Sequence, residues 1–330
     1  MGVYPKLTAA RRVLVIKQGA LGDVIMATAL IRAILDAHPQ AAVHLLTTPP
    51  YAALFSSWPG LNVTALPRRG WRATWQMLRF IRGQHFDCVY DLQANDRTGV
   101  LCALSGIPIR IGNPPRFPYN VHPAERWSGE THIFSRMLEV LAAAGIHDVP
   151  SRPFLPCSET DRAAVDAFLA RHRLQPKSFA VLHAGASPTR PEKRWPGFGA
   201  LAMQLRSRGI GVVWLGGPDD AALNRGLAAE SDIDASGVFS IPALAELATH
   251  ARFAVTNDSG PMHACAAAGI PVFALFGPSD WRRNHALGQA GHVIAGVSLL
   301  PDLAGERTAE CLDRISPDTV LAIIASHGLL

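Results

Sequence analysis

Short runs of apolar residues alternate with longer amphipathic segments along the first half of the chain. Three of the runs are predicted to be buried strands, at residues 13–16, 43–46 and 86–92. Residues 22–37 and 71–83 repeat apolar side chains at helical spacing and are predicted to be helices. This order of strand, helix and strand is typical of a parallel sheet with helices on both faces.

The same alternation restarts after residues 148–160, whose prolines indicate a linker. Strands are predicted beyond it at 179–183, 212–215, 253–256 and 271–276, and helices at 160–172, 197–208, 242–250 and 261–268. The sequence therefore predicts an α/β protein of two doubly wound domains, residues 1–155 and 156–330. Because open α/β sheets bind ligands beyond the carboxyl ends of their strands, we expect the site in an interdomain cleft.

Composition excludes several classes of protein. The 330 residues suit two domains, and 48% hydrophobic with 17% charged residues is ordinary for a globular chain. The five cysteines include no C-x-x-C pair, so neither a zinc site nor a disulfide framework is indicated. No signal peptide and no apolar run of about 18 residues is visible, which predicts a cytoplasmic protein with peripheral membrane contact at most. The net charge is only +5, and no motif that recognises nucleic acid is visible, which argues against nucleic acid as a partner.

The segment Gly19-Ala20-Leu21-Gly22-Asp23 follows the first predicted strand and opens the first predicted helix. Its glycines permit a tight turn and the close approach of another group. Asp23 would lie in the first helical turn, either as a general base facing the cleft or as a carboxylate favoured by the helix dipole. The spacing differs from G-x-G-x-x-G, and a carboxylate would repel a pyrophosphate there. A nicotinamide-dependent oxidoreductase is therefore disfavoured.

A second motif, Asn257 to His263, joins a predicted strand to a predicted helix. The amides at such a helix N-terminus form a good cradle for phosphate. Pro261 fits the first helical position. The alternative is an ordinary capped helix, with Ser259 or Asp258 as the N-cap.

Two further strand ends carry polar residues suited to a nucleotide. After strand 179–183, Ser187 could donate to phosphate, and Lys193 or Arg194 could neutralise it. After strand 212–215, Asp219 or Asp220 could accept the hydroxyls of a ribose. The alternatives are a solvated loop in the first case and a helix cap in the second. Together, these strand-end loops favour a phosphate and sugar site in the second domain.

A cluster of arginines in the first half indicates an anionic partner. Arg68, Arg69, Arg72 and Arg79 fall within or beside the predicted helix 71–83, which also carries two tryptophans. An amphipathic segment of this composition can rest on a membrane surface. The alternative is a core helix whose solvent face is rich in arginine.

At these motifs the chain resembles glycosyltransferase family 9, the ADP-heptose:lipopolysaccharide heptosyltransferases. The resemblance is carried by GALGDVIMATALIRAI at 19–34, DLQ at 91–93, KRWP at 193–196, TNDSGPMHACAAAGIPVFALFGPSD at 256–280 and ISPDTVLAI at 315–323. It implies a GT-B fold, in which two facing Rossmann-like domains bind the acceptor and the nucleotide-sugar respectively. It also implies inverting transfer of heptose without a metal or another cofactor.

The resemblance also implies roles for individual residues. Asp23 matches the catalytic base, and Lys193 matches the lysine at the donor phosphates. The acceptor, the inner core of a Kdo-lipid A type lipopolysaccharide at the cytoplasmic face of the inner membrane, would meet Lys17, Arg68, Arg69 and Arg72. The donor ADP-heptose would meet Ser187, Asp219 or Asp220, Phe239, Asp258, Ser259, Gly260, Pro261, Met262 and His263.

Two other functions fit the same pattern. One is a GT-B glycosyltransferase with a UDP-sugar or GDP-sugar donor or a different acceptor. The other is a non-catalytic nucleotide-binding module, because a fold alone does not determine function. Asp23 and Lys193 argue against the second, since a module that only binds a nucleotide needs no base.

Overall fold

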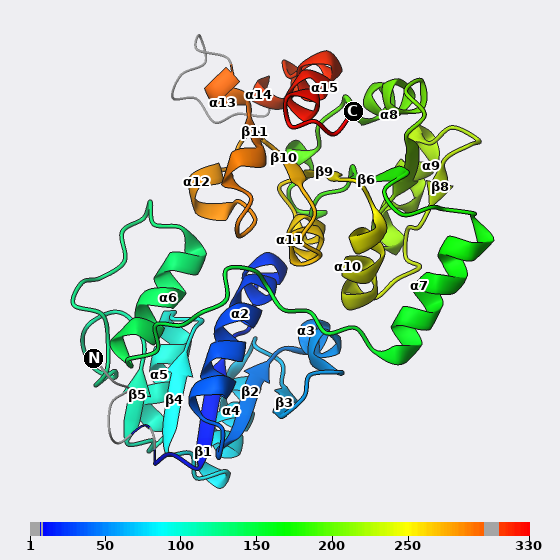
Figure 1. Ribbon diagram of the computed structural model, residues 1–330. Helices are drawn as coiled ribbons and strands as arrows, with labels where there is room; N and C mark the ends of the chain where they lie inside the picture. Colours follow the sequence, from blue (N-terminus) through cyan, green and yellow to red (C-terminus); the bar gives the residue numbers. More distant parts are fainter. Residues whose placement is uncertain (1–6, 8, 300–309) are drawn as a thin grey trace. The chain divides into compact units, whose positions relative to one another are not determined.

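The computed structural model describes residue 7, residues 9–299 and residues 310–330. The chain divides into two compact units, Met1–Pro156 and Cys157–Leu330. Each unit is a parallel β-sheet covered by helices, as the ribbon in Figure 1 shows.

The sheet of the first unit has the strand order β3-β2-β1-β4-β5. Its strands are β1 (Arg12–Ile16), β2 (Ala42–Thr47), β3 (Leu61–Ala65), β4 (Cys88–Asp91) and β5 (Ile109–Ile111), and their pairings are parallel. The helices are α2 (Leu21–Ala37), α3 (Pro49–Ala52), η1 (Ala53–Phe55), α4 (Trp71–Gly83), α5 (Asp96–Leu104) and α6 (Ile133–Ala143). Helix α2 packs with α6, and α4 packs with α5. The central strands β1 and β4 are almost wholly apolar and buried, as a sheet covered on both faces requires.

The sheet of the second unit has the order β11-β10-β9-β6-β7-β8. Its strands are β6 (Phe179–His183), β7 (Gly211–Trp214), β8 (Ile233–Asp234), β9 (Ala254–Asn257), β10 (Val272–Phe276) and β11 (Val293–Ala295). The helices are α7 (Glu159–Arg171), η2 (Pro191–Lys193), α8 (Phe198–Arg206), η3 (Pro218–Asp220), α9 (Ala221–Leu227), α10 (Ile241–His250), α11 (Gly260–Ala267), α12 (Trp281–Asn284), η4 (Ala290–His292), α13 (Gly296–Leu299), α14 (Glu310–Asp313) and α15 (Pro317–Ser326). Helix α10 packs against α7 and α11, whereas α8 packs against α15.

Each sheet reverses its strand order once, between β1 and β4 in the first unit and between β6 and β9 in the second. Neighbouring loops leave such a switch point in opposite directions and open a crevice at the carboxyl edge, where α/β proteins bind ligands. The loops after these four strands are therefore the positions at which to look for functional side chains.

The strands and helices predicted from the hydrophobic pattern are confirmed, with ends that shift by up to two residues. The prediction missed β3, α3, α5, β5 and α6 in the first unit, and β8, β11 and the helices α12 to α15 in the second. Strands β3 and β5 lie at the two edges of the sheet and are only partly buried, so they lack the continuous apolar run of a central strand. Helix α5 is short and weakly amphipathic, and its start depends on a capping box between Asn95 and Thr98.

Candidate active site

Asp23 lies in the first turn of α2, directly beyond the carboxyl end of β1. The turn before it needs a glycine, because Gly19 has a φ of +141° and a Cβ there would lie 2.8 Å from Nη1 of Arg68. That guanidinium donates to the Gln18 carbonyl at 3.2 Å. The glycine therefore brings the arginine loop after β3 against the loop that carries Asp23.

Asp23 is backed by a buried cation. Lys17 is 3% exposed, and its Nζ lies 3.7 Å from Oδ2 of Asp23, which is 25% exposed. Nζ also donates to the Leu92 carbonyl at 3.4 Å. Burial lowers the pKa of Lys17, while the charges of Asp23 and Asp91 oppose that shift. The carboxylate thus reaches solvent on one side and touches an ammonium group on the other.

The buried Asp91 side chain holds the loop after β4 in place through hydrogen bonds. Burial raises its pKa, against the hydrogen bonds that favour its charged form, above all the one from the Tyr119 hydroxyl at 2.6 Å. Its Oδ1 accepts from the amides of Gln93 and Ala94 at 3.1 and 2.8 Å. The Gln93 side chain in turn accepts from the Gln18 amide at 2.8 Å. These contacts tie together the two loops at the switch point of the first sheet.

The predicted acceptor-binding arginines lie beside this edge. Arg68, Arg69 and Arg72 are exposed. The first two line a pocket of about 310 Å³ with residues 48–51 and 67, after β2 and β3. Lys17, expected to bind the acceptor as well, is buried, and its described contacts are with Asp23 and Leu92. Whether these four residues bind an acceptor stays a prediction.

Helix α4 has a buried side and an exposed side, and contact of the exposed side with a membrane stays a prediction. One face, with Met77, Leu78 and Ile81, is buried in the core. Trp71 and Trp75 on the same helix are 75% and 56% exposed. No helix in the described part of the chain is long and apolar enough to cross a bilayer.

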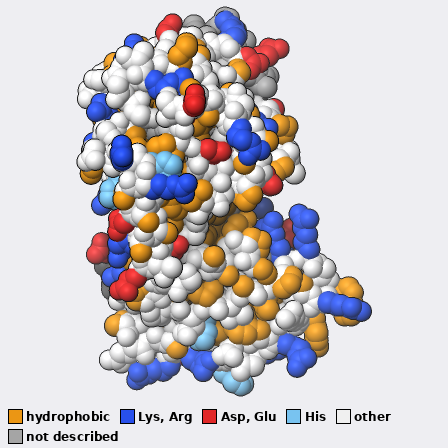
Figure 2. Space-filling model, turned by 90° about the vertical axis from the view of Figure 1, so that its right-hand side faces the viewer, with side chains coloured by type: hydrophobic (Ala, Val, Ile, Leu, Met, Phe, Trp, Pro, Cys, Tyr) orange, Lys and Arg blue, Asp and Glu red, His pale blue; other side chains and the backbone are white. Residues whose placement is uncertain are grey.

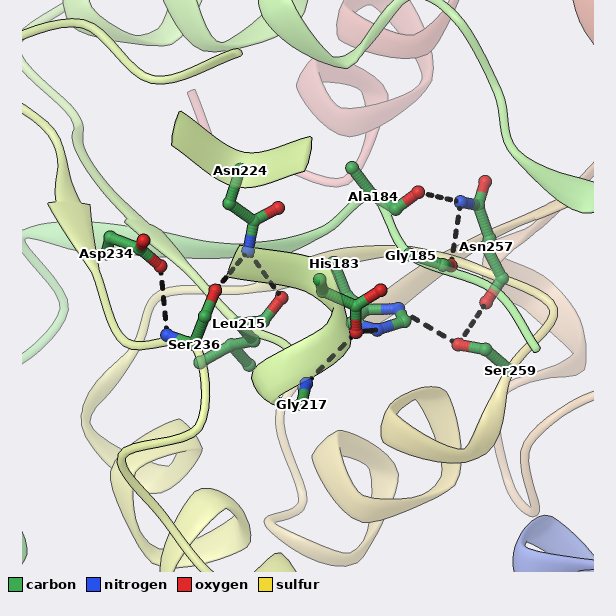
Figure 3. A network of polar contacts seen from close by, with 11 residues as sticks. His183, Ala184, Gly185, Leu215, Gly217, Asn224, Asp234, Ser236, Asn257 and Ser259 are labelled. Carbon is green, nitrogen blue, oxygen red and sulfur yellow. Dashed lines mark hydrogen bonds and ion pairs between the residues drawn. The ribbon is translucent and has the colours of Figure 1, made fainter. Parts of the chain in front are cut away.

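In the second unit, side chains from the ends of four adjacent strands, β10, β9, β6 and β7, gather at the carboxyl edge of the sheet. Figure 3 shows the central part of this network, between the loops after β6, β7 and β9. His183 is the last residue of β6, and Ser259 follows β9. Both loops were predicted from the sequence to hold site residues, but His183 was not among those residues.

Lys193 and Asp258 form an ion pair at this edge, with 2.6 Å between Nζ and Oδ2. The Ser279 hydroxyl donates to the same carboxylate oxygen at 2.5 Å. The side chains of Lys193 and Asp258 are 18% and 9% exposed, so the pair is largely buried within the loop cluster. Ser279 belongs to the turn after β10, to which the sequence analysis gave no role.

Helix α11 begins at Gly260, with Ser259 at its N-cap position. Pro261 occupies the second helical position rather than the predicted first one. The Ser259 hydroxyl does not cap the helix, because it contacts Nδ1 of His183 at 3.0 Å and the Asn257 carbonyl at 3.2 Å. The side chains of Met262 and His263 are buried, so only backbone groups of this turn can meet a ligand.

The structure distinguishes the two acidic residues after β7. Asp219 is exposed, whereas the Asp220 side chain is 13% exposed and accepts from the Gly217 amide at 3.0 Å. Asp220 stands at the N-cap position of α9 without capping that helix, but its carboxylate forms a capping box with the Gly217 amide at the start of η3, so the capping alternative holds for η3. Burial would raise the pKa of Asp220, but His183, the Gly217 amide and Arg194 outweigh it and lower the pKa.

Asn257 is fully buried and joins two of the predicted motifs. Its amide nitrogen donates to the carbonyls of Ala184 and Gly185 at 2.8 and 3.1 Å, and its Oδ1 accepts from the Trp195 amide at 3.1 Å. It thus holds both the small-residue loop and the segment that carries Lys193. Its position as a polar residue at the carboxyl end of a buried strand was the signal that could have identified it.

The two remaining residues that were predicted to bind the donor take no part in this network of contacts. Ser187 is exposed, and its hydroxyl contacts that of Thr189 at 3.0 Å. Phe239 is partly buried and packs edge-on against Phe168 of α7, with ring centroids 5.0 Å apart. Among the described residues, no group of three or more His, Cys, Asp or Glu side chains could hold a metal ion.

Comparison with known proteins identifies the family. A model described as glycosyltransferase family 9 (heptosyltransferase) matches residues 74–311, which is most of the chain. The chain belongs to glycosyltransferase family 9. It is therefore an enzyme that transfers a glycosyl group, and the alternative of a non-catalytic binding module is set aside.

Relatives and solved structures agree with membership of family 9. The chain is 26% identical over 301 residues to lipopolysaccharide heptosyltransferase 2 of Escherichia coli K12, covering 82% of this chain and 83% of the relative. A family 9 glycosyltransferase of Veillonella parvula has a similar structure, with a TM-score of 0.79, 22% identity and 96% of each chain covered. The E. coli ADP-heptose lps heptosyltransferase II gives a TM-score of 0.72 at 24% identity, over 96% of this chain and 98% of that one. These likenesses show that the two Rossmann-like units form a GT-B fold.

Proposed function

We propose that this family 9 enzyme transfers heptose from ADP-heptose to the inner core of lipopolysaccharide, with inversion at the anomeric carbon and without a metal ion. The relative in E. coli is named a lipopolysaccharide heptosyltransferase, and the similar solved enzyme is named for ADP-heptose. The observation that carries the proposal is the Lys193–Asp258 pair, in a loop cluster that also contains the N-terminus of α11.

Asp23 is the proposed general base on the acceptor side. It takes the proton from the acceptor hydroxyl while the oxygen attacks the anomeric carbon of the donor. The bond from that carbon to the diphosphate breaks in the same displacement, and ADP leaves with the bonding electron pair. The buried Nζ of Lys17 lies 3.7 Å from Oδ2 of Asp23 and so holds the carboxylate beside the loop after β1.

The diphosphate leaves on the donor side, where fixed positive charge can replace a metal ion. Lys193 supplies an ammonium group, and the first amides of α11 supply the positive end of a helix dipole. Arg194 adds a buried Nε that has no hydrogen-bond partner among the described residues. Charge arranged in advance where negative charge develops is usually the largest contribution to catalysis.

Asp258 and Asp219 or Asp220 are the proposed contacts of the sugars. Asp258 contacts Lys193 and Ser279, and its carboxylate can accept a hydrogen bond from a hydroxyl of the heptose. The ribose would meet the acidic turn after β7. Ser187 and the backbone near Phe239 complete the proposed donor site, at the phosphates and the adenine respectively.

The acceptor is proposed to bind the first unit through its phosphates and acidic sugars. Arg68, Arg69 and Arg72 are exposed beside the loop of Asp23, so they can hold anionic groups while a hydroxyl reaches the base. The pocket of about 310 Å³ between the loops after β2 and β3 offers room for one of them.

We also propose that the enzyme works at the cytoplasmic face of the inner membrane, because its acceptor is anchored in lipid. Trp71 and Trp75 lie one helical turn apart on α4, and Arg72 stacks over the Trp71 ring at 5.4 Å from its centroid. Exposed aromatic and basic side chains together suit an anionic lipid surface. Figure 2 shows hydrophobic and basic side chains next to one another on the face that it presents.

The first experiment is a thermal-shift panel with ADP, UDP, GDP and NAD, followed by a transfer assay with ADP-heptose and core acceptor. A ligand that binds the native state raises the melting temperature according to its affinity. We expect a clear preference for ADP. A preference for UDP or GDP would overturn the donor but keep the glycosyltransferase, and no response to any nucleotide would contradict the proposed donor site.

Membrane association has its own test in liposome flotation. Binding to vesicles that contain anionic lipid should fall several-fold when Trp71 and Trp75 are both changed to Ala, and it should weaken with salt. Met203→Ala is the matched control, because Met203 is a 59% exposed apolar residue of the second unit. Equal binding of the double variant and the wild type would exclude α4 as the contact.

A further inference from the structure

His183 contacts both halves of the proposed donor site. Its Nδ1 lies 3.0 Å from the Ser259 hydroxyl at the start of α11, and its Nε2 lies 3.6 Å from Oδ2 of Asp220 after β7 (Figure 3). The first contact is a hydrogen bond. The second is longer than a hydrogen bond but close enough for electrostatic attraction. The imidazole is 3% exposed, so it reaches no ligand itself.

The place of His183 in the sheet explains why it can bridge these loops. It ends β6, which lies between β7 and β9 at the switch point. Ser259 follows β9 and Asp220 follows β7, so the ring stands between the loops of both neighbouring strands. The ring turns one nitrogen toward each loop, and which partner donates in the contact with Ser259 depends on the tautomer.

The loops around the ring are shaped for this arrangement. A Cβ on Gly185 would lie 2.2 Å from Oδ1 of Asp220, so the glycine after β6 leaves room for the carboxylate. Asp220 is also held by the Gly217 amide at 3.0 Å. Lys193 and Asp258 pair with each other at the neighbouring strand end, and Arg194 is the cation whose charge acts on Asp220.

We propose that His183 is a positioning residue that couples recognition of the ribose to recognition of the diphosphate. This inference rests on the proposed function, since it assumes that the donor is a nucleoside diphosphate sugar. By fixing the Asp220 carboxylate and the Ser259 hydroxyl relative to one another, the rigid ring holds both subsites at the spacing of one nucleotide. A ligand that binds one subsite then meets the other already in place.

The test is a double-mutant cycle on the full-length protein, with the dissociation constant of ADP measured by calorimetry. Ser259→Ala and Asp220→Asn, alone and combined, should be non-additive by at least about twofold when His183 is present, because they share one network. In the His183→Leu background the same two changes should be additive. His327→Asn, an exposed histidine in the same unit, is the control.

Two conservative variants separate positioning from folding. His183→Asn places an amide where Nδ1 lies, and His183→Gln reaches the position of Nε2, so each keeps one of the two contacts. Each should weaken ADP binding by about two- to tenfold and raise the donor KM, while kcat at saturating donor stays within about twofold of wild type. If His183→Leu does not fold, measurements on these two variants test the proposal instead.

The outcomes distinguish this inference from the proposed function. Wild-type affinity for ADP in both conservative variants, or additive effects of Ser259→Ala and Asp220→Asn in the presence of His183, overturns the coupling and leaves the donor intact. If the wild type binds UDP or GDP instead of ADP, the proposed donor is overturned and the cycle is measured with that nucleotide. Binding of no nucleotide overturns both.

Discussion

Lys193 Nζ lies 2.6 Å from Oδ2 of Asp258, although the two residues are 65 positions apart in the sequence. The pair joins the segment before α8 to the loop after β9. A cation held in this way is already oriented before a substrate arrives, which is the condition for electrostatic stabilisation of a leaving group.

Lys193→Met should lower kcat for heptosyl transfer by about 10²–10³-fold, because the diphosphate would leave without its cation. Lys193→Arg should retain more activity, since it keeps the charge. Steady-state transfer assays measure both variants. Arg225→Ala, an exposed cation on α9, is the control and should behave as the wild type. A Lys193→Met enzyme with an unchanged kcat would remove Lys193 from the leaving-group role.

Asp23→Ala should lower transfer by about 10²–10⁴-fold, the usual range for loss of a general base. ADP binding should stay as in the wild type, because the donor is proposed to bind the second unit. Transfer assays and thermal shifts with ADP separate the two effects. Asp36→Asn is the control, since Asp36 is 61% exposed near the end of the same helix and pairs with Arg32. Residual turnover within about tenfold of the wild type would exclude Asp23 as the base.

Arg69→Ala should raise the KM for the core acceptor several-fold and leave the KM for the donor unchanged, because the arginine is exposed and lines the pocket between the loops after β2 and β3. The increase should shrink at high salt, where screening weakens the wild-type contact as well. Arg171→Ala, an exposed arginine at the end of α7, serves as the control. A rise in the donor KM instead would place Arg69 in a different role.

The free energy of unfolding should fall as the pH drops below about 6.5, in part because of His38. Burial lowers the pKa of His38, whose Nε2 lies 2.9 Å from the Tyr90 hydroxyl. The unfolded chain therefore takes up this proton at a higher pH than the folded chain does. The contribution of His38 to the free energy of unfolding is therefore fully present above the pKa that His38 has in the unfolded chain. It is lost as the pH falls from that value to the pKa in the folded chain.

Urea unfolding at a series of pH values from 7.5 to 5.5 checks this prediction. The contribution of His38 is at most about 1.4 kcal/mol per pH unit, the value for one proton. His38→Gln keeps a polar group near Tyr90 without a titrating ring, so its unfolding free energy should depend less steeply on pH. Equal slopes for the variant and the wild type would mean that His38 does not contribute.

The sequence by itself determined the elements whose local pattern is strong. Central strands such as β1 and β6 are continuous apolar runs because both faces of each sheet are covered, and α2 repeats apolar residues at helical spacing. The loops that follow these strands were predictable too, since the carboxyl ends of parallel strands meet at one edge. Asp23, Lys193 and Asp258 were predicted as site residues in this way, together with the family resemblance.

Only the tertiary structure decided which side chains meet at that edge. His183, Asp220 and Ser259 are separated by 37 and 39 positions in the chain, and no local pattern relates them; they meet because strand order places β6 between β7 and β9. The burial of Lys17 beneath Asp23 likewise depends on the packing of β1 against β4. A residue's neighbours in sequence set its secondary structure, whereas its charge partners depend on the register and order of strands far away in the chain.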